Sequence, residues 1–526
     1  MPETPVFATA AVAAPHRLAA ETGLMVLAAG GNAVEAMVAM AATAAVVAPR
    51  LNGPGGDGFW LVREPKGRVH ALDASGPAGT LATMRRYWDK GYDAIPVHGP
   101  EAALTVAGAV GGWALALELA KALGGKMPLD LLLGDAIRFA RDGYPISIME
   151  GRVLADAPDL FTVPGFAAVF LEEKKLPPAG TTRRNLKLAD ALGHLAHAGL
   201  GDFYRGDVGR EIAADLERIG SPILRSDLEN YRPRVVEPLS LRLKHSTVYS
   251  VPPPSQGLAS LLTLGIFEWL HVRRGETPEH HHGLIEAAKR AFAIRDRVIT
   301  DPREVEHDLK ALLAPDALER EAVRIDGRRA ADLSGVVDSG EGVWMGCIDK
   351  DGLAVSYSQS LFSAFGSGSI LPTTGIHWHN RGTAFSLDPK SRNPLEPGRK
   401  PFHTLNPGLA AFDDGRVLAY GSGEGEPQVL SQIFSRYAVS GMGLTDAVDA
   451  PRSLFTKGTD GPMLKLEDRF DPSLIRDLSR LGHSVEELGK RYADAHGHAG
   501  MVVKHPRNGR VEASHDPRAD GEVLGL

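Results

Sequence analysis

Hydrophobic positions in the first part of the chain repeat mostly at helical spacing. Residues 18–29 and an alanine-rich stretch that ends at Val47 are predicted helices, separated by the stop-and-restart signal Gly30-Gly31-Asn32. The alanine-rich stretch contains Glu35 and is short for a membrane span, so we expect a buried core helix. Residues 59–63 and 68–73 alternate like strands that pair as a hairpin.

The hydrophobic pattern changes character after residue 340. Before it, helical spacing continues over residues 106–141 (with a break at Gly124-Gly125), 185–198, 208–219, 258–272 and 282–297. Residues 309–340 are polar and weakly patterned, which is typical of an exposed, cleavable linker. After it, strands are predicted at residues 343–347, 354–360, 408–412, 417–420, 499–503 and 510–513, and helices at 429–440 and 472–481. A helix-covered pair of sheets and two separate α/β domains both fit this order.

Composition narrows the class of protein. The chain has 526 residues, which is long for one core, and its 43% hydrophobic and 23% charged residues are ordinary for a globular protein. The net charge of −7 comes from mixed signs without a basic stripe, so nucleic acid is not an expected partner. Cys347 is the only cysteine, which excludes an intramolecular disulfide and a cysteine metal cluster. No basic and then apolar leader opens the chain, so we expect a cytoplasmic protein without a membrane partner.

Several short segments, taken in order, resemble the γ-glutamyltransferase family. They are His16-Arg17-Leu18-Ala19, Ala29–Ala36, the glycine-rich loop Gly53–Phe59, Pro252–Gly257, Glu286–Phe292 with Asp301-Pro302, Asp349-Lys350-Asp351-Gly352, Phe365-Gly366-Ser367-Gly368, Ala450-Pro451-Arg452 and Asp516–Gly521. Each segment alone is a weak signal, but the ordered set runs from about residue 8 to the last residue and is specific.

The resemblance implies an α+β protein, a four-layer αββα sandwich of the N-terminal-nucleophile hydrolase type. Such proteins are made as one chain that cuts itself ahead of a threonine, which gives residues 1–341 as a large-subunit-like region and 342–526 as a small-subunit-like region of one intertwined fold. The new terminal threonine is the nucleophile and its α-amine is the base. The resemblance implies no cofactor and no metal, and it is compatible with a homodimer.

The nucleophile position itself carries glycine. Counting back from Asp349-Lys350-Asp351-Gly352 without a gap places it on Gly342, which has no Oγ for self-cleavage or for an acyl-enzyme. Three explanations stay open. The chain is a natural homologue that lost or replaced the chemistry, or it is a variant with the nucleophile removed, or the register is shifted and a nearby side chain such as Ser339 serves. Cys347 is expected to be an inert core thiol.

The substrate side also departs from enzymes that process glutathione. Ala71-Leu72-Asp73 is followed by Ala74-Ser75-Gly76, without the arginine that holds a glutamyl α-carboxylate, and the stretch His379–Phe385 has no acid for the α-amine. Residues 342–346, 378–382, 401–407 and 497–500 resemble the oxamate-amidohydrolase branch, which acts on small amides with a nearby carboxylate. Arg381 either pairs with such a carboxylate or is a structural arginine.

The loop that supplies the oxyanion hole in this family is altered as well. Gly421–Gln428 is shorter than the family pattern and contains Glu424, which opposes oxyanion formation if it points inward but not if it points to solvent. The resemblance assigns catalytic positions to Gly342, His403, Thr404, Ser422 and Gly423. It assigns substrate binding to Ser360, Asn380 and Arg381.

Histidines offer weak metal signals. His377 and His379 share one face of a strand, His496 and His498 do the same, and His280-His281-His282 form a run, but zinc needs three or four converging ligands. The loop Gly53–Phe59 lacks the lysine-hydroxyl pair of a phosphate loop and is expected to be a tight turn lining the pocket.

Three functions follow from these observations. The first is an amide hydrolase or acyltransferase of this family for a small amide other than glutathione. The second is an uncut, catalytically silent homologue that binds a small ligand or a partner. The third is hydrolysis by an unfamiliar nucleophile or a bound metal.

Overall fold

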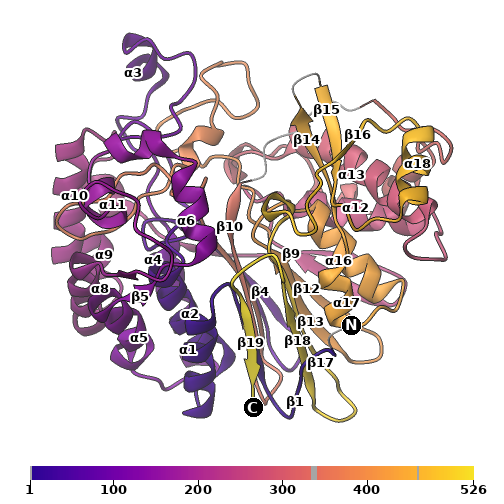
Figure 1. Cartoon of the computed structure of the whole chain (residues 1–526), viewed down its shortest axis with the longest axis horizontal. Helices are drawn as coiled ribbons and strands as arrows, with labels where there is room; N and C mark the ends of the chain where they lie inside the picture. The colour runs from indigo at the N-terminus through magenta and orange to yellow at the C-terminus, as the bar shows by residue number, and fades with distance from the viewer. Residues whose placement is uncertain (1–2, 333–339, 459–460) are drawn as a thin grey trace.

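The computed structural model describes residues 3–332, 340–458 and 461–526. Two seven-stranded sheets stack face to face with helices on both outer faces, so the layers run helix, sheet, sheet, helix (Figure 1). Side chains such as Phe59, Trp344 and Val502 fill the space between the sheets. Since each sheet is covered on both faces, its central strands are buried on both faces as well.

The first sheet combines strands from the two ends and the middle of the chain. In spatial order it contains β1 (Val6–Phe7), β18 (Val511–His515), β17 (Ala499–Lys504), β13 (Val417–Ser422), β12 (Gly408–Phe412), β9 (Ser246–Ser250) and β8 (Leu239–Arg242), all paired antiparallel.

The second sheet holds the strand that begins at the expected junction. Its order is β19 (Glu522–Gly525), β2 (Ala11–Ala14), β10 (Glu341–Ile348), β11 (Ala354–Phe362), β3 (Asp57–Arg63), β4 (Val69–Ala74) and β7 (Arg234–Val236), again antiparallel. Both sheets therefore mix strands from before and after Glu341, and the alternative of two separate α/β domains is wrong. Sequence analysis missed β2 and β19 because each has only four residues.

Helices from the first half of the chain cover the second sheet. They are α1 (Arg17–Ala28), α2 (Ala33–Val47), α4 (Ala109–Ala122), α5 (Leu129–Asp142), α8 (Leu186–Ala198) and α10 (Asp207–Ile219), with the shorter α3 (Met84–Asp89), α6 (Ile148–Ala155), η1 (Pro158–Thr162), α7 (Phe166–Phe170), α9 (Asp202–Arg205) and α11 (Arg225–Asn230) around them. A small hairpin joins β5 (Tyr144–Pro145) and β6 (Thr182–Arg183).

The alanine-rich helix α2 is the buried core helix that the sequence predicts. All of its residues are buried, and it packs on β10 and β11. It begins with a capping box in which the Asn32 side chain accepts from backbone N–H groups while Glu35 accepts from the Asn32 N–H. Within the described residues, no helix combines the length and apolarity that crossing a membrane requires.

Helices from the later part of the chain cover the first sheet. They are α12 (Gly257–Trp269), α13 (Pro278–Val298), α14 (Leu309–Leu312), α15 (Pro315–Ala322), α16 (Gln428–Ala438), α17 (Leu444–Asp449) and α18 (Pro472–Arg480). Three one-turn helices lie in connecting segments: η2 (Pro302–Glu304), η3 (Arg381–Ala384), which packs against Leu104, and η4 (Asp494–His496). A third small sheet, β14 (Ser453–Gly458), β15 (Gly461–Leu466) and β16 (Val485–Glu487), lies beside them.

The segment predicted as a polar linker is folded over part of its length. Leu318 of α15 is buried against α12, so the prediction of an exposed linker is wrong there. Pro315 begins α15 at a position that tolerates proline. The buried side chains of this helix, Leu318 and Ala322, lie on one face of it. Ser339 lies outside the described residues.

Candidate active site

Gly342 lies at an irregularity of the β10–β11 ladder. Glu341 pairs with Phe362 but Val343 pairs with Gln359, so two residues of β11 lie opposite Gly342. An added Cβ at Gly342 would stand 3.0 Å from Ser360 Cβ and 3.1 Å from both Gln359 O and Leu405 Cδ2. These contacts are tight, so even the first atom of a threonine side chain would require its neighbours to shift.

Ser360 contacts the peptide group ahead of Gly342. Its hydroxyl donates a hydrogen bond to the Glu341 carbonyl oxygen and accepts one of 2.6 Å from the Phe362 N–H. The structure therefore places Ser360 beside the expected junction between Glu341 and Gly342, where its hydroxyl binds the protein backbone.

The loop after β13 packs over Gly342, and its Gly423 N–H and Ser422 hydroxyl both already donate hydrogen bonds within the protein. An added Cβ at Gly423 would stand 2.2 Å from Gly342 O, so only glycine permits this approach. The Gly423 N–H donates to His498 O at 3.0 Å, and the Ser422 hydroxyl donates to Glu424 O at 2.6 Å. Since an oxyanion hole needs free donors aimed at the reacting carbonyl, neither of these two groups offers one in this conformation.

A cavity of about 540 Å³ opens beside Glu341. Its walls include Gly340, Phe362, Arg381 and Thr404. The Arg381 guanidinium stacks 3.6 Å over the Phe362 ring and donates to Thr404 Oγ1 at 2.9 Å and to Phe402 O at 3.3 Å. Arg381 is only 1% exposed, and among the described residues no carboxylate lies within salt-bridge distance of it. The cavity wall thus holds a buried cation that has only neutral hydrogen-bond acceptors.

Asn380 supports the cavity wall and does not line it. Its amide donates to Val97 O at 2.9 Å and to Ser363 Oγ at 3.1 Å, and its oxygen accepts from the Ser363 N–H at 3.1 Å. The predicted contact of Asn380 with substrate stays a prediction.

His403 faces a buried carboxylate that sequence analysis did not single out. Its Nε2 lies 3.3 Å from Asp57 Oδ2, while Asp57 Oδ1 accepts from the N–H groups of Gly76 at 3.2 Å and Gly108 at 3.0 Å. Burial raises the pKa of Asp57 to about 8 and lowers the pKa of His403 well below its ordinary value. Because His403 Nδ1 accepts from the Leu405 N–H, the proton of the neutral imidazole lies on Nε2, which donates to Asp57 Oδ2. These two contacts position the backbone at residues 403–405.

The glycine-rich loop explains how Asp57 reaches this place. An added Cβ at Gly55 would stand 2.1 Å from His377 O, and one at Gly56 would stand 2.3 Å from Ser360 O. The loop thus packs backbone against backbone and aims Asp57 inward. The run of glycines before Asp57 was the sequence feature that could have indicated its buried position.

The segment where a glutamyl-binding arginine is expected contains the ion pair of Asp73 and Lys400. Asp73 Oδ2 accepts from Lys400 Nζ at 2.6 Å, and Asp73 Oδ1 accepts from the Ser75 N–H and hydroxyl at 2.9 and 2.6 Å. These groups satisfy one another, so the segment after Leu72 presents no free cation for an α-carboxylate.

Glu424 points into the protein, not to solvent. It is 6% exposed, and its Oε1 is buried without a hydrogen-bond partner among the described residues. Burial, and then the neighbouring carboxyl groups of Glu341 and Asp494, raise the pKa of Glu424 well above its ordinary value. The alternative of a solvent-facing Glu424 is wrong, and the altered loop carries a buried acid next to Glu341.

We predict that Glu424→Gln removes a pH-dependent loss of stability. The folded chain keeps the Glu424 proton above the pH at which the unfolded chain releases it, so stability falls as pH rises from the ordinary pKa of glutamate, by at most about 1.4 kcal/mol per pH unit for one proton. With EDTA present to remove bound metal ions, the Tm of Glu424→Gln should equal that of the unsubstituted chain near pH 4.5. At pH 8 the Tm of the variant should be higher. The exposed Glu487→Gln is the control, and a parallel fall of Tm in the unsubstituted chain and in Glu424→Gln would contradict the prediction.

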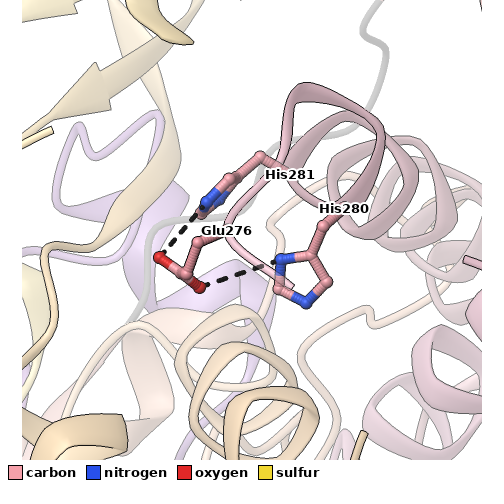
Figure 2. Close-up of side chains that lie close together, drawn as sticks. All are labelled: Glu276, His280 and His281. Atoms are coloured by element: carbon pink, nitrogen blue, oxygen red, sulfur yellow. Dashed lines mark ion pairs between the residues drawn. The ribbon is translucent and has the colours of Figure 1, made fainter. Parts of the chain in front are cut away.

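Histidines form buried clusters away from the cavity. Figure 2 shows His280 and His281 directed at Glu276, with nitrogen–oxygen distances of 3.9 and 3.5 Å. Arg436 already pairs with both Glu276 oxygens, at 2.8 and 3.1 Å. This cluster is therefore an ion-paired support for the start of α13.

The other candidate histidines have hydrogen-bond partners in different parts of the fold. His282 Nδ1 lies 2.8 Å from His483 Nε2, His379 Nε2 lies 2.9 Å from Thr105 O, and His496 Nε2 lies 3.1 Å from Lys465 O. Cys347 is fully buried in β10, and burial raises the pKa of its thiol, which confirms the expected core position.

Known proteins match this chain over nearly its full length. The family model for gamma-glutamyltranspeptidase matches residues 19–526. The chain is 46% identical to the oxamate amidohydrolase proenzyme of Klebsiella pneumoniae subsp. pneumoniae, over 97% of each chain. It is 35% identical to the glutathione hydrolase-like YwrD proenzyme of Bacillus subtilis, over 98% of each chain.

A solved structure matches the fold equally well. The cephalosporin acylase from Bacillus halodurans superposes with a TM-score of 0.91 at 31% identity, covering 100% of this chain and 97% of that one. The layers described above are those of the N-terminal-nucleophile hydrolase sandwich, and the chain belongs to the gamma-glutamyltranspeptidase family.

Proposed function

We propose that this chain recognises a small amide that carries a carboxylate, and that the threonine chemistry of its family cannot operate at Gly342. The observation that carries the proposal is the Arg381 guanidinium, buried on the cavity wall over Phe362 without a carboxylate partner among the described residues. Burial lowers the pKa of Arg381, and the charges of Asp57 and Glu426 offset part of this effect without contacting the guanidinium. An anionic ligand in the cavity would supply the direct partner that a buried cation favours.

The chemistry of the ligand follows from the groups around it. A guanidinium binds a carboxylate through parallel hydrogen bonds. Asn393 and Thr383 also line the cavity and offer amide and hydroxyl groups for a second polar function. Oxamate carries one carboxylate and one amide, and the relative from Klebsiella pneumoniae is named for it. Glutathione is disfavoured because the Asp73–Lys400 pair occupies the segment of the expected glutamyl clamp.

Two versions of the function remain within this proposal. In the first, the chain is an amide hydrolase or acyltransferase with a substitute for the threonine nucleophile. In the second, it is an uncut binding protein, which the missing Oγ at Gly342 and the engaged Gly423 N–H favour. The division into regions 1–341 and 342–526, a homodimeric assembly and a cytoplasmic location stay predictions.

We predict that Arg381→Met weakens oxamate binding by about tenfold to more than a hundredfold. A hydrogen bond to a charged group contributes about 1.5–3 kcal/mol, and each loss of about 1.4 kcal/mol lowers the affinity tenfold. Isothermal titration of the full chain with oxamate measures it, and an ammonia assay in the same samples separates a hydrolase from a binding protein.

The controls separate charge from fold. Arg381→Lys keeps a cation, so it should lose less affinity than Arg381→Met, and Arg320→Met on the exposed face of α15 should lose none. Acetamide, which lacks the carboxylate, should bind more weakly than oxamate. Equal affinities of the unsubstituted chain and Arg381→Met for oxamate, with unchanged Tm, would overturn the proposal.

A further inference from the structure

Three acidic side chains and one histidine meet on the side of Glu341 where the altered loop packs. Glu341 begins β10, Glu424 follows β13, Asp494 lies in η4, and His498 precedes β17. One ligand-type atom each of Glu424, Asp494 and His498 lies within 4.8 Å of the other two. Side chains from separate segments therefore converge on one point next to the Glu341–Gly342 bond.

The cluster has three carboxyl groups and one arginine. Arg50 is its cation, with Nη1 at 3.1 Å from Glu341 Oε2 and 3.7 Å from Asp494 Oδ2. Among the described residues Arg50 makes no hydrogen bond or ion pair with Glu424, whose Oε1 is buried without a hydrogen-bond partner. A buried carboxyl oxygen without a hydrogen bond or an ion pair is destabilising by itself, and a metal ion bound to it would supply the missing contact.

We propose that Glu424, Asp494 and His498 form a binding site for a divalent transition-metal ion of the zinc class. Two carboxylates and an imidazole are a nitrogen and oxygen ligand set that suits Zn²⁺ or Mn²⁺, whereas Mg²⁺ and Ca²⁺ take oxygen ligands almost alone. The Asp494 side chain is 37% exposed, so an ion reaches the site from solvent.

Small movements complete the geometry. His498 Nε2 now lies 2.5 Å from Asp494 Oδ1, a hydrogen bond whose proton the metal replaces. Two ligands at about 2.0–2.1 Å from a tetrahedral zinc lie about 3.3 Å apart, so this pair must separate by less than about 1 Å. The Asp494 side chain, 37% exposed in a one-turn helix, has room to move by that amount. The other separations, all within 4.8 Å, would close to about 3.3 Å around the ion.

The other two histidine clusters lack the unpaired acid that marks this site. Glu276, to which His280 and His281 point in Figure 2, is held on both oxygens by Arg436. Glu286, near His282 and His483, is paired with Lys289 at 2.6 Å. A metal at either place would first have to displace a buried cation.

A metal here would link the loop over Gly342 to the segment before β17. Glu424 and His498 belong to the two backbone stretches whose hydrogen bond, Gly423 N–H to His498 O, closes the loop. The inference departs from the expectation that the protein holds no metal, and it does not depend on the proposed function, because it concerns ion binding in the absence of any organic ligand.

Zinc titration of the full chain tests the site. Protein stripped with EDTA and dialysed should bind one equivalent of Zn²⁺ by isothermal titration and by elemental analysis, and a large excess of Mg²⁺ should not compete. Glu424→Gln and His498→Gln should each weaken Zn²⁺ binding by at least about tenfold. His281→Gln, in the cluster of Figure 2, is the matched control and should leave the affinity unchanged.

The outcomes are distinguishable from a folding defect. Tm of every variant in EDTA shows whether it is folded, and Co²⁺ substitution reports coordination through its visible absorption. Absence of stoichiometric Zn²⁺ binding overturns the proposal. So does loss of binding in His281→Gln, or competition by Mg²⁺ at millimolar concentration.

Discussion

The purified chain should run as one band at 56.1 kDa on a denaturing gel, with Glu341 still joined to Gly342. Self-cleavage in this family needs a side-chain hydroxyl at the residue after the cut, to attack the carbonyl carbon before it. Gly342 has none, although Ser360 still donates to the Glu341 carbonyl. Intact-mass spectrometry measures the result, and fragments of 341 and 185 residues would contradict it. A new terminus at Ser339 would identify a substitute nucleophile.

Restoring the hydroxyl alone should not restore cutting. In Gly342→Thr the new Cβ meets Ser360, Gln359 and Leu405 at 3.0–3.1 Å, and the Gly423 N–H still donates to His498 O. The attacking group would therefore be crowded and its oxyanion would lack this donor. Gly342→Ala adds the Cβ without the hydroxyl and controls for crowding through its Tm. Rapid cutting of Gly342→Thr would show that the loss is confined to one side chain.

Arg518→Met should lower the free energy of unfolding by about 3–5 kcal/mol, because it removes one of the two fully buried cations that balance the buried carboxylates Glu467 and Asp516. Arg518 donates to Glu467 Oε1 at 2.7 Å and to Asp516 Oδ1 at 3.0 Å, and Arg452 pairs with Asp516 Oδ2 at 2.6 Å. All four side chains are fully buried. Two motif segments, Ala450-Pro451-Arg452 and Asp516–Gly521, are thus joined as one neutral network.

Thermal unfolding of paired variants measures this effect. Arg320→Met removes an exposed ion pair with Asp316 on α15, at 2.6 Å, and should leave Tm unchanged. Methionine keeps most of the apolar volume of Arg518, so the difference between the two variants reports the uncompensated charge. Equal Tm values for both variants would contradict the prediction.

Much of the fold was readable from local patterns. The capping signal at Asn32, the hairpin at residues 59–73 and the glycine break near residue 124 all mark elements that the structure contains. Long helices and apolar strands can be predicted because burial of one face makes hydrophobic residues recur at a regular spacing along each element. Very short strands carry too few residues for a period, so β2 and β19 were missed. The topology was decided by pairing between strands hundreds of residues apart, such as β10 with β2.

The site divides in the same way. The order of residues alone determined that position 342 has no hydroxyl, that no arginine follows Asp73 directly, and that an acid stands in the loop 421–428, because these are statements about atoms present or missing. Only the tertiary structure decided which groups those atoms meet. It placed Asp57 against His403, Arg381 over Phe362, and Glu424 inside the protein beside Asp494 and His498. Burial and charge balance depend on partners brought from distant segments, and no local pattern encodes them.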